Sequence, residues 1–187
     1  MGSVASLPRK WTYSDLERFP EDGPRYELYD GELWELPSPT GRHQFCTLQC
    51  ARLLADYADR TDGVALASPL DIVFSKHDVV QPDVVFFSAG RKDLVNWDGA
   101  TRHAPDLVVE ALSPGTQGND RGRKLRMFVR YGVPEYWLLD PRERTVEVRS
   151  LRDGDYVLVL TARCGETFTS PLFPDLGCDV SWLFRDC

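Results

Sequence analysis

Two acidic residues, Asp83 and Glu110, each lie within an apolar, β-branched stretch that is typical of a buried strand. Asp83 lies in 79–87 (VVQPDVVFF) and Glu110 lies in 106–113 (DLVVEALS). A carboxylate that is buried without a partner loses its free energy of hydration, and no other interaction offsets this loss. If the two strands are neighbours, both carboxylates can lie on one face and share a cation, which removes this cost. The alternative, in which each acid ends a strand and points to solvent, stays open on these residues alone.

A lysine follows on the next predicted helix. Asp120, Lys124, Phe128 and Tyr131 recur at three- and four-residue steps, so they share one side of that helix. The helix follows the Glu110 strand after a short turn, so its first turns are expected to return near Glu110. Two acids and a lysine are the minimum set for metal-assisted hydrolysis of a phosphodiester. Taken by itself, an exposed Asp120–Lys124 helix pair worth about 0.3–0.5 kcal/mol is the simpler interpretation.

The overall charge argues against a dedicated nucleic-acid binder. The chain has a net charge of -7, whereas phosphate contacts usually require a basic protein. Local positive charge exists between Arg121 and Arg130, close to the predicted site. Hydrophobic residues make up 42% of the 187 residues, which is enough for one well-filled domain. We expect a single domain over 1–187 with a core at roughly 26–162.

The cysteines and the apolar segments indicate a soluble, reducing, cytoplasmic setting. Five cysteines without regular spacing do not suggest a disulfide framework. The start, 1–10, has no apolar segment of signal-peptide length, and no window reaches the roughly 20 apolar residues that span a membrane. Cys46 and Cys50 share a helical face with His43, but no fourth ligand supports zinc, and both cysteines are expected to be small core residues.

Hydrophobic periodicity and turn residues predict an α/β fold. Asp30-Gly31 and Asp153-Gly154 are typical hairpin turns. Between these hairpins the order of elements is helix, three strands, helix, strand. The predicted elements are strands on either side of Asp30-Gly31 within 26–36, a helix at 43–57, strands at 64–74, 79–87 and 107–113, a helix at 119–131, a strand at 135–139 and a hairpin of 145–151 with 156–162.

The motifs in this order resemble a bacterial family of restriction-endonuclease-like proteins, often called Uma-two, in the PD-(D/E)XK nuclease superfamily. The resemblance runs from about Trp11 to Phe184, and its specificity lies in the order and spacing of several motifs. The matching segments are YELYDGEL at 26–33, Pro37-Ser38-Pro39 with His43, QPDVV at 81–85, APDLVVEALSP at 104–114, Asp120, Lys124 and YGVPEYWLLDP at 131–141.

The resemblance implies a mixed central sheet flanked by helices, with an added β-hairpin. It implies Asp83 and Glu110 as ligands of Mg²⁺ or Mn²⁺, together with a backbone carbonyl beside Glu110. The superfamily pattern has lysine two residues after the second acid, where this chain has Leu112, so Lys124 is expected to supply the ammonium from the next helix. Glu32 and His43 are weaker candidates for accessory roles.

The function expected from this resemblance is metal-dependent hydrolysis of DNA by a homodimer, since two-fold symmetry suits the cutting of both strands. The rival interpretation is a catalytically inactive binding or regulatory module that keeps the nuclease fold. The net charge and the residue at 112 favour the rival.

Overall fold

The largest sheet in the described part of the chain has six strands and mixed direction. The computed structural model describes residues 9–20, 22–185 and 187. The signal-peptide expectation concerns 1–10, and its first eight residues lie outside the described residues. The strands of this sheet are β3 (Val64–Ala67), β6 (Val84–Phe87), β7 (Leu107–Ala111), β8 (Glu135–Asp140), β9 (Thr145–Arg152) and β10 (Asp155–Arg163). Their spatial order is β10-β9-β8-β7-β6-β3, and β7 and β8 run parallel while their neighbours pair antiparallel.

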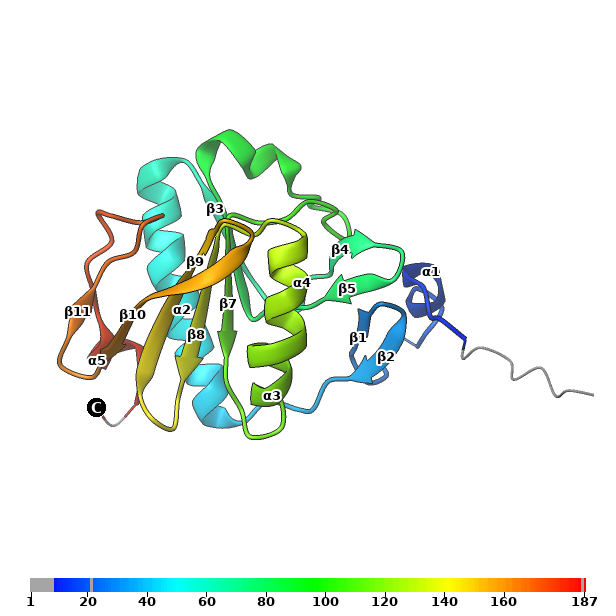
Figure 1. Cartoon of the computed structure of the whole chain (residues 1–187), viewed down its shortest axis with the longest axis horizontal. Coiled ribbons are helices and arrows are strands. Elements are labelled where there is room, and N and C mark those ends of the chain that lie inside the picture. The colour runs from blue at the N-terminus through cyan, green and yellow to red at the C-terminus, as the bar shows by residue number, and fades with distance from the viewer. Residues whose placement is uncertain (1–8, 21, 186) are drawn as a thin grey trace, which may run out of the picture.

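Helices cover both faces of this sheet (Figure 1). On one face lies α2 (Gly41–Thr61), which buries Cys46, Cys50 and Leu54 against alternate residues of β6, β7 and β8. On the other face lies α4 (Leu125–Arg130), whose Met127 and Phe128 pack on the intervening residues. The strands are therefore apolar on both faces, as expected for a sheet between two helical layers.

A smaller antiparallel sheet lies beside α4, away from β9 and β10 (Figure 1). Within the described residues it contains β1 (Tyr26–Tyr29), β2 (Glu32–Glu35), β4 (Ile72–Ser75) and β5 (Asp78–Val80), in the order β2-β1-β5-β4. Tyr29 of β1 and Val80 of β5 join the same hydrophobic cluster as Phe128. This small sheet therefore packs on the side of the large sheet that α4 covers.

The remaining described elements are short. The first helix, α1, begins after Thr12, whose hydroxyl and backbone amide both donate to the Asp15 carboxylate. The short elements of the described chain are α1 (Tyr13–Leu16), a 3₁₀ helix η1 (Ala89–Leu94), α3 (Gln117–Asn119), the π-helical turn η2 (Asp120–Lys124), β11 (Thr167–Phe168), β12 (Cys178–Asp179) and α5 (Val180–Leu183).

The predicted fold class is confirmed: a mixed central sheet is flanked by helices, and the hairpin of β9 and β10 extends it. The hairpin turns at Asp30-Gly31 and Asp153-Gly154 are also confirmed, and both dipeptides have positive φ angles. The extent of a single domain over 1–187, with a core at 26–162, stays a prediction.

Two predicted strands were wrong in their extent. The stretch 64–74 divides into β3 and β4, and 79–87 divides into β5 and β6, with the two halves of each in different sheets. Pro69 and Pro82 fall in the two interruptions, and a proline has no amide hydrogen to donate to a sheet. Asp83 consequently lies in the connection that enters β6, not in the middle of a strand.

The predicted helix at 119–131 begins earlier and changes its winding. Residues 117–119 form α3, and the chain then makes the wider η2 turn before α4. Asp120 and Lys124 open and close this π-helical turn, and both are buried. The expectation of an exposed ion pair on the helix surface is therefore wrong, since both side chains face the interior.

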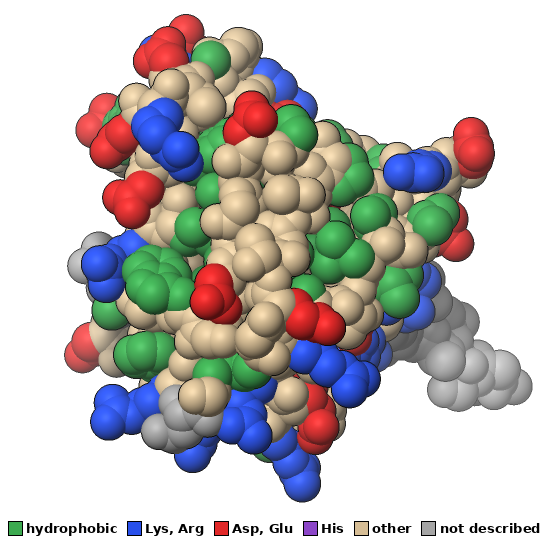
Figure 2. Space-filling view, turned by 90° about the vertical axis from the view of Figure 1, so that its left-hand side faces the viewer, with side chains coloured by type: hydrophobic (Ala, Val, Ile, Leu, Met, Phe, Trp, Pro, Cys, Tyr) green, Lys and Arg blue, Asp and Glu red, His purple; other side chains and the backbone are tan. Residues whose placement is uncertain are grey.

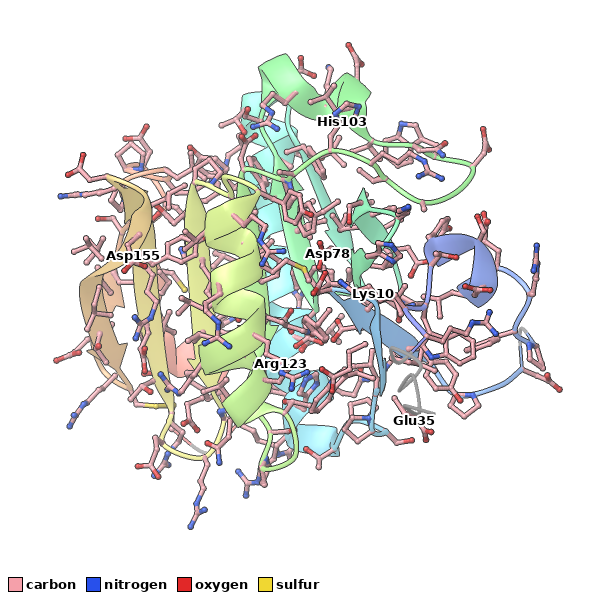
Figure 3. All side chains as sticks on the ribbon, turned by 45° about the vertical axis from the view of Figure 1, so that its right-hand side comes forward. Lys10, Glu35, Asp78, His103, Arg123 and Asp155 are labelled. Carbon is pink, nitrogen blue, oxygen red and sulfur yellow. A yellow bond between two sulfur atoms is a disulfide. The ribbon has the colours of Figure 1, made fainter. Side chains whose placement is uncertain are left out.

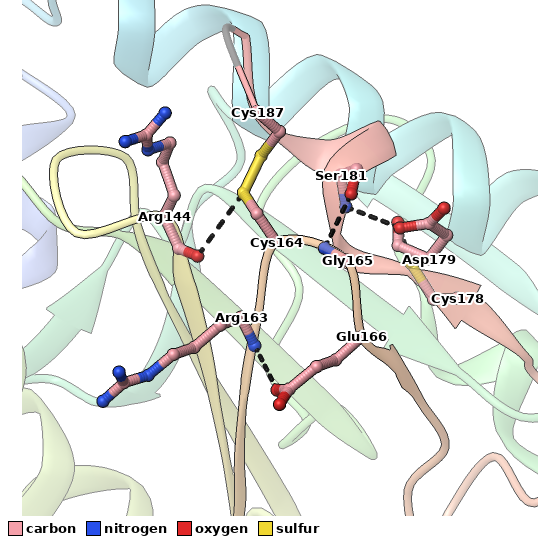
Figure 4. Close-up of a disulfide and its surroundings, with 9 residues drawn as sticks. All are labelled: Arg144, Arg163, Cys164, Gly165, Glu166, Cys178, Asp179, Ser181 and Cys187. Atoms are coloured by element: carbon pink, nitrogen blue, oxygen red, sulfur yellow. Dashed lines mark hydrogen bonds between the residues drawn. A yellow bond between two sulfur atoms is a disulfide. The ribbon is translucent and has the colours of Figure 1, made fainter.

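The cysteines were predicted in part. Cys46, Cys50 and Cys178 are buried and free, and burial raises the pKa of the Cys46 thiol to about 12. Cys164 and Cys187, however, form a disulfide near the end of β10 (Figure 4). The sequence spacing does not suggest this bond, because the two cysteines are 23 positions apart and meet only after the chain has folded back through β11, β12 and α5.

No helix in the described residues has the length and apolar character needed to cross a membrane.

Gly63 links α2 to β3 at a point where backbone and ring crowd together. A Cβ at this position would lie 2.7 Å from Cζ of Phe86 and 2.9 Å from the carbonyl oxygen of Phe87. We predict that Gly63→Ala lowers the free energy of unfolding by about 1–3 kcal/mol, because a buried ring and a strand must shift. Urea denaturation measures this, with Gly90→Ala as control, since its Cβ would meet nothing within 4 Å. Equal stability of the two variants would contradict the prediction.

Candidate functional site

A buried lysine ammonium joins the two sheets. Nζ of Lys124 lies 2.8 Å from Oε1 of Glu110 on β7 and 3.0 Å from Oε1 of Glu27 on β1. Oδ1 of Asp120, one turn earlier on the same helical segment, lies 3.7 Å away. The lysine side chain is only 5% exposed. Helix, large sheet and small sheet thus meet at one charged atom.

Glu27 is the residue of this cluster that sequence analysis did not assign to the site. It is fully buried, and it accepts hydrogen bonds from the hydroxyl of Tyr29 and, at 2.9 Å, from the backbone amide of Gln81. The amide group of Asn119 in turn donates to the Tyr29 hydroxyl at 2.7 Å. The signal for Glu27 in the sequence is weaker than that for Asp83 and Glu110: it lies between Tyr26 and Leu28 in a four-residue strand without β-branched residues.

Asp83 lies at the same end of the large sheet as Glu110. The register pairs Val84 with Val109, so Asp83 and Glu110 are the next opposed positions. One Asp83 oxygen, Oδ2, accepts the backbone amide of Ala111 at 2.7 Å and lies 3.1 Å from Nε2 of His43. The predicted shared face for the two acids is therefore observed, and the first turn of α2 brings His43 to it from the opposite face of the sheet.

Asp120 is the least compensated group of the cluster. The residue is 1% exposed, and the only side-chain donor near its carboxylate besides Lys124 is the Thr116 hydroxyl, which lowers its pKa without making a hydrogen bond of good geometry among the described residues. Burial raises the pKa of the Asp120 carboxyl above its ordinary value, and the Lys124 ammonium opposes this shift. Burying an ionised carboxylate with few hydrogen-bond donors lowers the stability of the fold, unless the group is protonated or faces a cation.

The same imbalance of charge shifts the pKa of the ion pair. Burial raises the pKa of Glu110 well above its usual range; Lys124 opposes this shift, while the charges of Asp83 and Asp120 add to it. Burial by itself would lower the pKa of Lys124, but the carboxylates of Glu110 and Glu27 outweigh it and raise that pKa. Burial is the main cause of the Glu110 shift and the surrounding carboxylates cause the Lys124 shift, and in both groups the protonated form is favoured.

The five charged or ionisable groups predicted from the sequence are only partly brought together. Asp83, Glu110, Lys124 and His43 line one pocket of about 50 Å³. Glu32 does not line it. The Glu32 carboxylate is exposed and pairs at 2.7 Å with Arg123, a residue labelled in Figure 3 whose guanidinium also lies over the ring of Trp34 in β2. The accessory role expected for Glu32 therefore has no support in its position.

The pocket suits a hard divalent cation in charge and in ligand type. Its carboxylates exceed its positive charge, and the Lys124 ammonium lies no closer than 3.7 Å to the buried Asp120 carboxylate, so added positive charge would stabilise the buried acids. Among the described residues, no three His, Cys, Asp or Glu side chains are already spaced to hold a metal. Mg²⁺ commonly uses one or two carboxylates and keeps several waters, and Asp83 with Glu110 would provide those two.

Three comparisons with known proteins concern the family and the fold. A family model described as "Uma2: Putative restriction endonuclease" matches residues 13–181. The uncharacterized protein slr1290 of Synechocystis sp. is 26% identical over 139 residues, which are 72% of this chain and 71% of that protein. A crystal structure of a "putative nuclease belonging to DUF820" from Anabaena variabilis has a TM-score of 0.71 and 24% identity, covering 92% of this chain and 98% of that one. The comparison with the Anabaena variabilis structure, at 24% identity, concerns the fold alone.

The charge balance around Lys124 generates a stability prediction. Lys124→Met is expected to lower the free energy of unfolding by about 3–5 kcal/mol, because the buried carboxylates lose their counter-charge. Glu110→Gln is expected to change it little without metal, since Glu27 still pairs with Lys124 and one repelling charge is gone. Thermal melts of the metal-free proteins measure both, and a large drop in Tm for Glu110→Gln would contradict the prediction.

The pH dependence of these melts has a defined sign. The pKa of Glu110 is raised in the folded state, so the folded protein binds a proton that the unfolded chain has released. The resulting stability is fully present below the unfolded pKa and is lost as pH rises through the folded pKa. The Tm of Glu110→Gln relative to the wild type should therefore increase as pH rises.

Proposed function

This chain belongs to the Uma2 family, and from that premise we propose that it is a metal-dependent endonuclease that hydrolyses phosphodiester bonds in DNA. The observation that carries the proposal is the contact of the Lys124 ammonium with Glu110 inside a pocket that Asp83 and His43 also line. Two comparisons support the same class of reaction: the family model is described as "Putative restriction endonuclease", and the Anabaena variabilis protein is described as a "putative nuclease".

Each residue of the pocket has a role that its position supports. Asp83 and Glu110 would hold Mg²⁺ or Mn²⁺ through carboxylate oxygens. The bound ion would supply Lewis acidity, lowering the pKa of a water and polarising the phosphate. Lys124 orients Glu110 through their 2.8 Å contact, and its charge would stabilise negative charge that develops on a phosphate bound in the pocket. His43 and the Ala111 amide act as positioning groups because both contact one oxygen of Asp83.

A second candidate function is a binding or regulatory module without catalysis. The observation in its favour is that Glu27 and Glu110 already engage the ammonium of Lys124, at 3.0 and 2.8 Å. Leu112 at the position where the superfamily pattern has lysine points the same way. Plasmid cleavage separates the two functions.

We predict that the purified protein nicks supercoiled plasmid with Mg²⁺ or Mn²⁺ and not with EDTA. Asp83→Ala should reduce the rate at least ~100-fold, because a metal ligand supports several kcal/mol of transition-state stabilisation. Asp98→Ala is the matched control, since Asp98 is an exposed acid outside the pocket and its replacement should leave the rate unchanged. Absence of cleavage with either metal would favour the binding module.

The proposal includes a homodimer that acts on DNA in the cytoplasm. The outer strand β10 supports self-association, because Val157, Leu158 and Val159 are 46, 48 and 36% exposed on an edge of the large sheet. Antiparallel pairing of two such edges would bury this apolar segment with two-fold symmetry.

Sedimentation equilibrium tests the dimer. The wild type should sediment as a dimer at micromolar concentration, and Leu158→Lys should sediment as a monomer because it places a charge in the proposed interface. Leu48→Lys, at a 60% exposed position on α2, is the control and should remain dimeric. A monomeric wild type would remove the dimer and leave the cleavage proposal in place.

A further inference from the structure

Arg25 brings positive charge to the candidate site from the small sheet. It directly precedes β1, and its side chain lines the same pocket as Asp83 and Glu110. The pairing of β1 with β2 continues through Arg25, whose carbonyl accepts a backbone hydrogen bond of 2.8 Å. Alternate residues of a strand share a face, so Arg25 lies on the face of Glu27, the residue that contacts Lys124. The small sheet thus supplies one wall of the pocket, and Arg25 is a cation of that wall.

A short chain of hydrogen bonds holds Arg25 beside Asp83. One guanidinium nitrogen of Arg25 donates to the Ser68 hydroxyl at 3.0 Å. The backbone amide of Ser68 donates to the carbonyl oxygen of Asp83, also at 3.0 Å. The register explains this second bond, because Ala67 pairs with Val84 and the next opposed positions are Ser68 and Asp83. The guanidinium is therefore tied to the backbone of a proposed metal ligand.

Three basic side chains line the pocket among the described residues, and they differ in the donors they have left. Nζ of Lys124 lies within 3.0 Å of two carboxylates, and the side chain is only 5% exposed. Nε2 of His43 lies 3.1 Å from another carboxylate oxygen. The Arg25 guanidinium forms no ion pair in the described part of the chain, and its hydrogen bond there goes to Ser68. A guanidinium has five N–H groups, so most of those of Arg25 remain for a ligand.

The chemistry of the pocket suits this arginine to a phosphate. A volume of about 50 Å³ holds a few water-sized groups, so a phosphate that enters it meets the groups of the wall directly. The three carboxylates of the pocket would repel a phosphodiester, and a positive group facing the phosphate offsets that repulsion. Two guanidinium N–H groups can bind two phosphate oxygens in parallel, which a lysine ammonium cannot do.

The charge of the surrounding surface is also uneven. Figure 2 shows Lys and Arg side chains gathered at the lower end of the molecule, where α2 begins in Figure 1. The pocket lies at this end, because His43 in the first turn of α2 lines it. A chain with a net charge of -7 is therefore not uniformly acidic around the site.

We propose that Arg25 binds the DNA phosphate that enters the pocket, and holds it between the small sheet and Asp83. This inference rests on the proposed function and adds a residue that contacts the substrate. Arg25 donates to the phosphate oxygens and stabilises the charge that develops on them during hydrolysis. Lys124, which already contacts two carboxylates, keeps its role of orienting Glu110.

Fluorescence anisotropy in EDTA and low salt tests the phosphate contact without turnover, with a labelled DNA duplex as the probe. Arg25→Ala should bind about tenfold more weakly than the wild type. The slope of its log affinity against log salt should fall by about 0.9, as expected for one lost phosphate contact. Arg25→Lys retains the charge, so its slope should stay close to that of the wild type.

The matched control is Arg152→Ala, which makes the same change in net charge. Arg152 is exposed at the last position of β9, well beyond Glu147, the residue of β9 that aligns with Glu110 across β8. Its replacement should leave the affinity within about twofold of the wild type and the salt slope unchanged. Circular dichroism melts of each variant check that the fold is intact.

A second variant separates a phosphate contact from a purely structural role of Arg25. Ser68→Ala removes the hydrogen bond to the guanidinium but keeps its charge, so it should lower kcat/KM for plasmid nicking only about threefold. Arg25→Ala should lower kcat/KM about 100-fold, because a donor to the developing charge is lost. Arg25→Lys should recover part of that loss, since it restores the charge without the two parallel hydrogen bonds.

The outcomes separate this inference from the proposed function. If the wild type nicks plasmid and Arg25→Ala nicks it equally fast, the inference is overturned and the nuclease stands. Equal salt slopes for Arg25→Ala and Arg152→Ala, or equal effects of Arg25→Ala and Ser68→Ala, would also overturn it. Duplex binding that depends on Arg25 without any nicking would support the phosphate contact and reject the nuclease. A wild type that neither binds nor nicks DNA would reject both.

Discussion

The ammonium of Lys124 is the constraint on which the arrangement of this molecule depends. It lies between Glu110 of the large sheet and Glu27 of the small sheet, and its own backbone belongs to the helical segment that separates them. Ion pairs buried this deeply cost desolvation energy, and they hold only when the geometry is good and the remaining charge is satisfied. Three separate elements must therefore dock together for the lysine to be accommodated.

The excess of acid around this lysine links stability to the proposed activity. Burial raises the pKa of Asp120 and Glu110, so the pocket keeps protons that the proposed cation would displace. A protein that only needed stability would gain by replacing such groups with apolar residues. Buried groups with strongly shifted pKa values in a pocket are typical of functional sites, and the Uma2 match gives the shift a chemical interpretation.

Several predictions from the sequence failed for identifiable physical reasons. The stretches 64–74 and 79–87 look continuous in hydrophobicity, but Pro69 and Pro82 interrupt the hydrogen-bonding ladder and send each half to a different sheet. An exposed position for Lys124 is the simpler expectation, because a spacing of four from Asp120 does not distinguish an outer face from a buried π-helical turn. The disulfide of Cys164 and Cys187 depends on chain reversals that spacing does not encode.

The sequence by itself determined the fold class and the two hairpin turns, because hydrophobic periodicity and turn residues are local properties of the chain, while the shared face of Asp83 and Glu110 also required that β6 and β7 pair. Only the tertiary structure decided that Glu27 joins the site, that Glu32 does not, and that Arg25 lines the pocket. These residues are brought together or kept apart by the packing of two sheets and two helices. Such long-range contacts have no period or spacing in the sequence from which to read them.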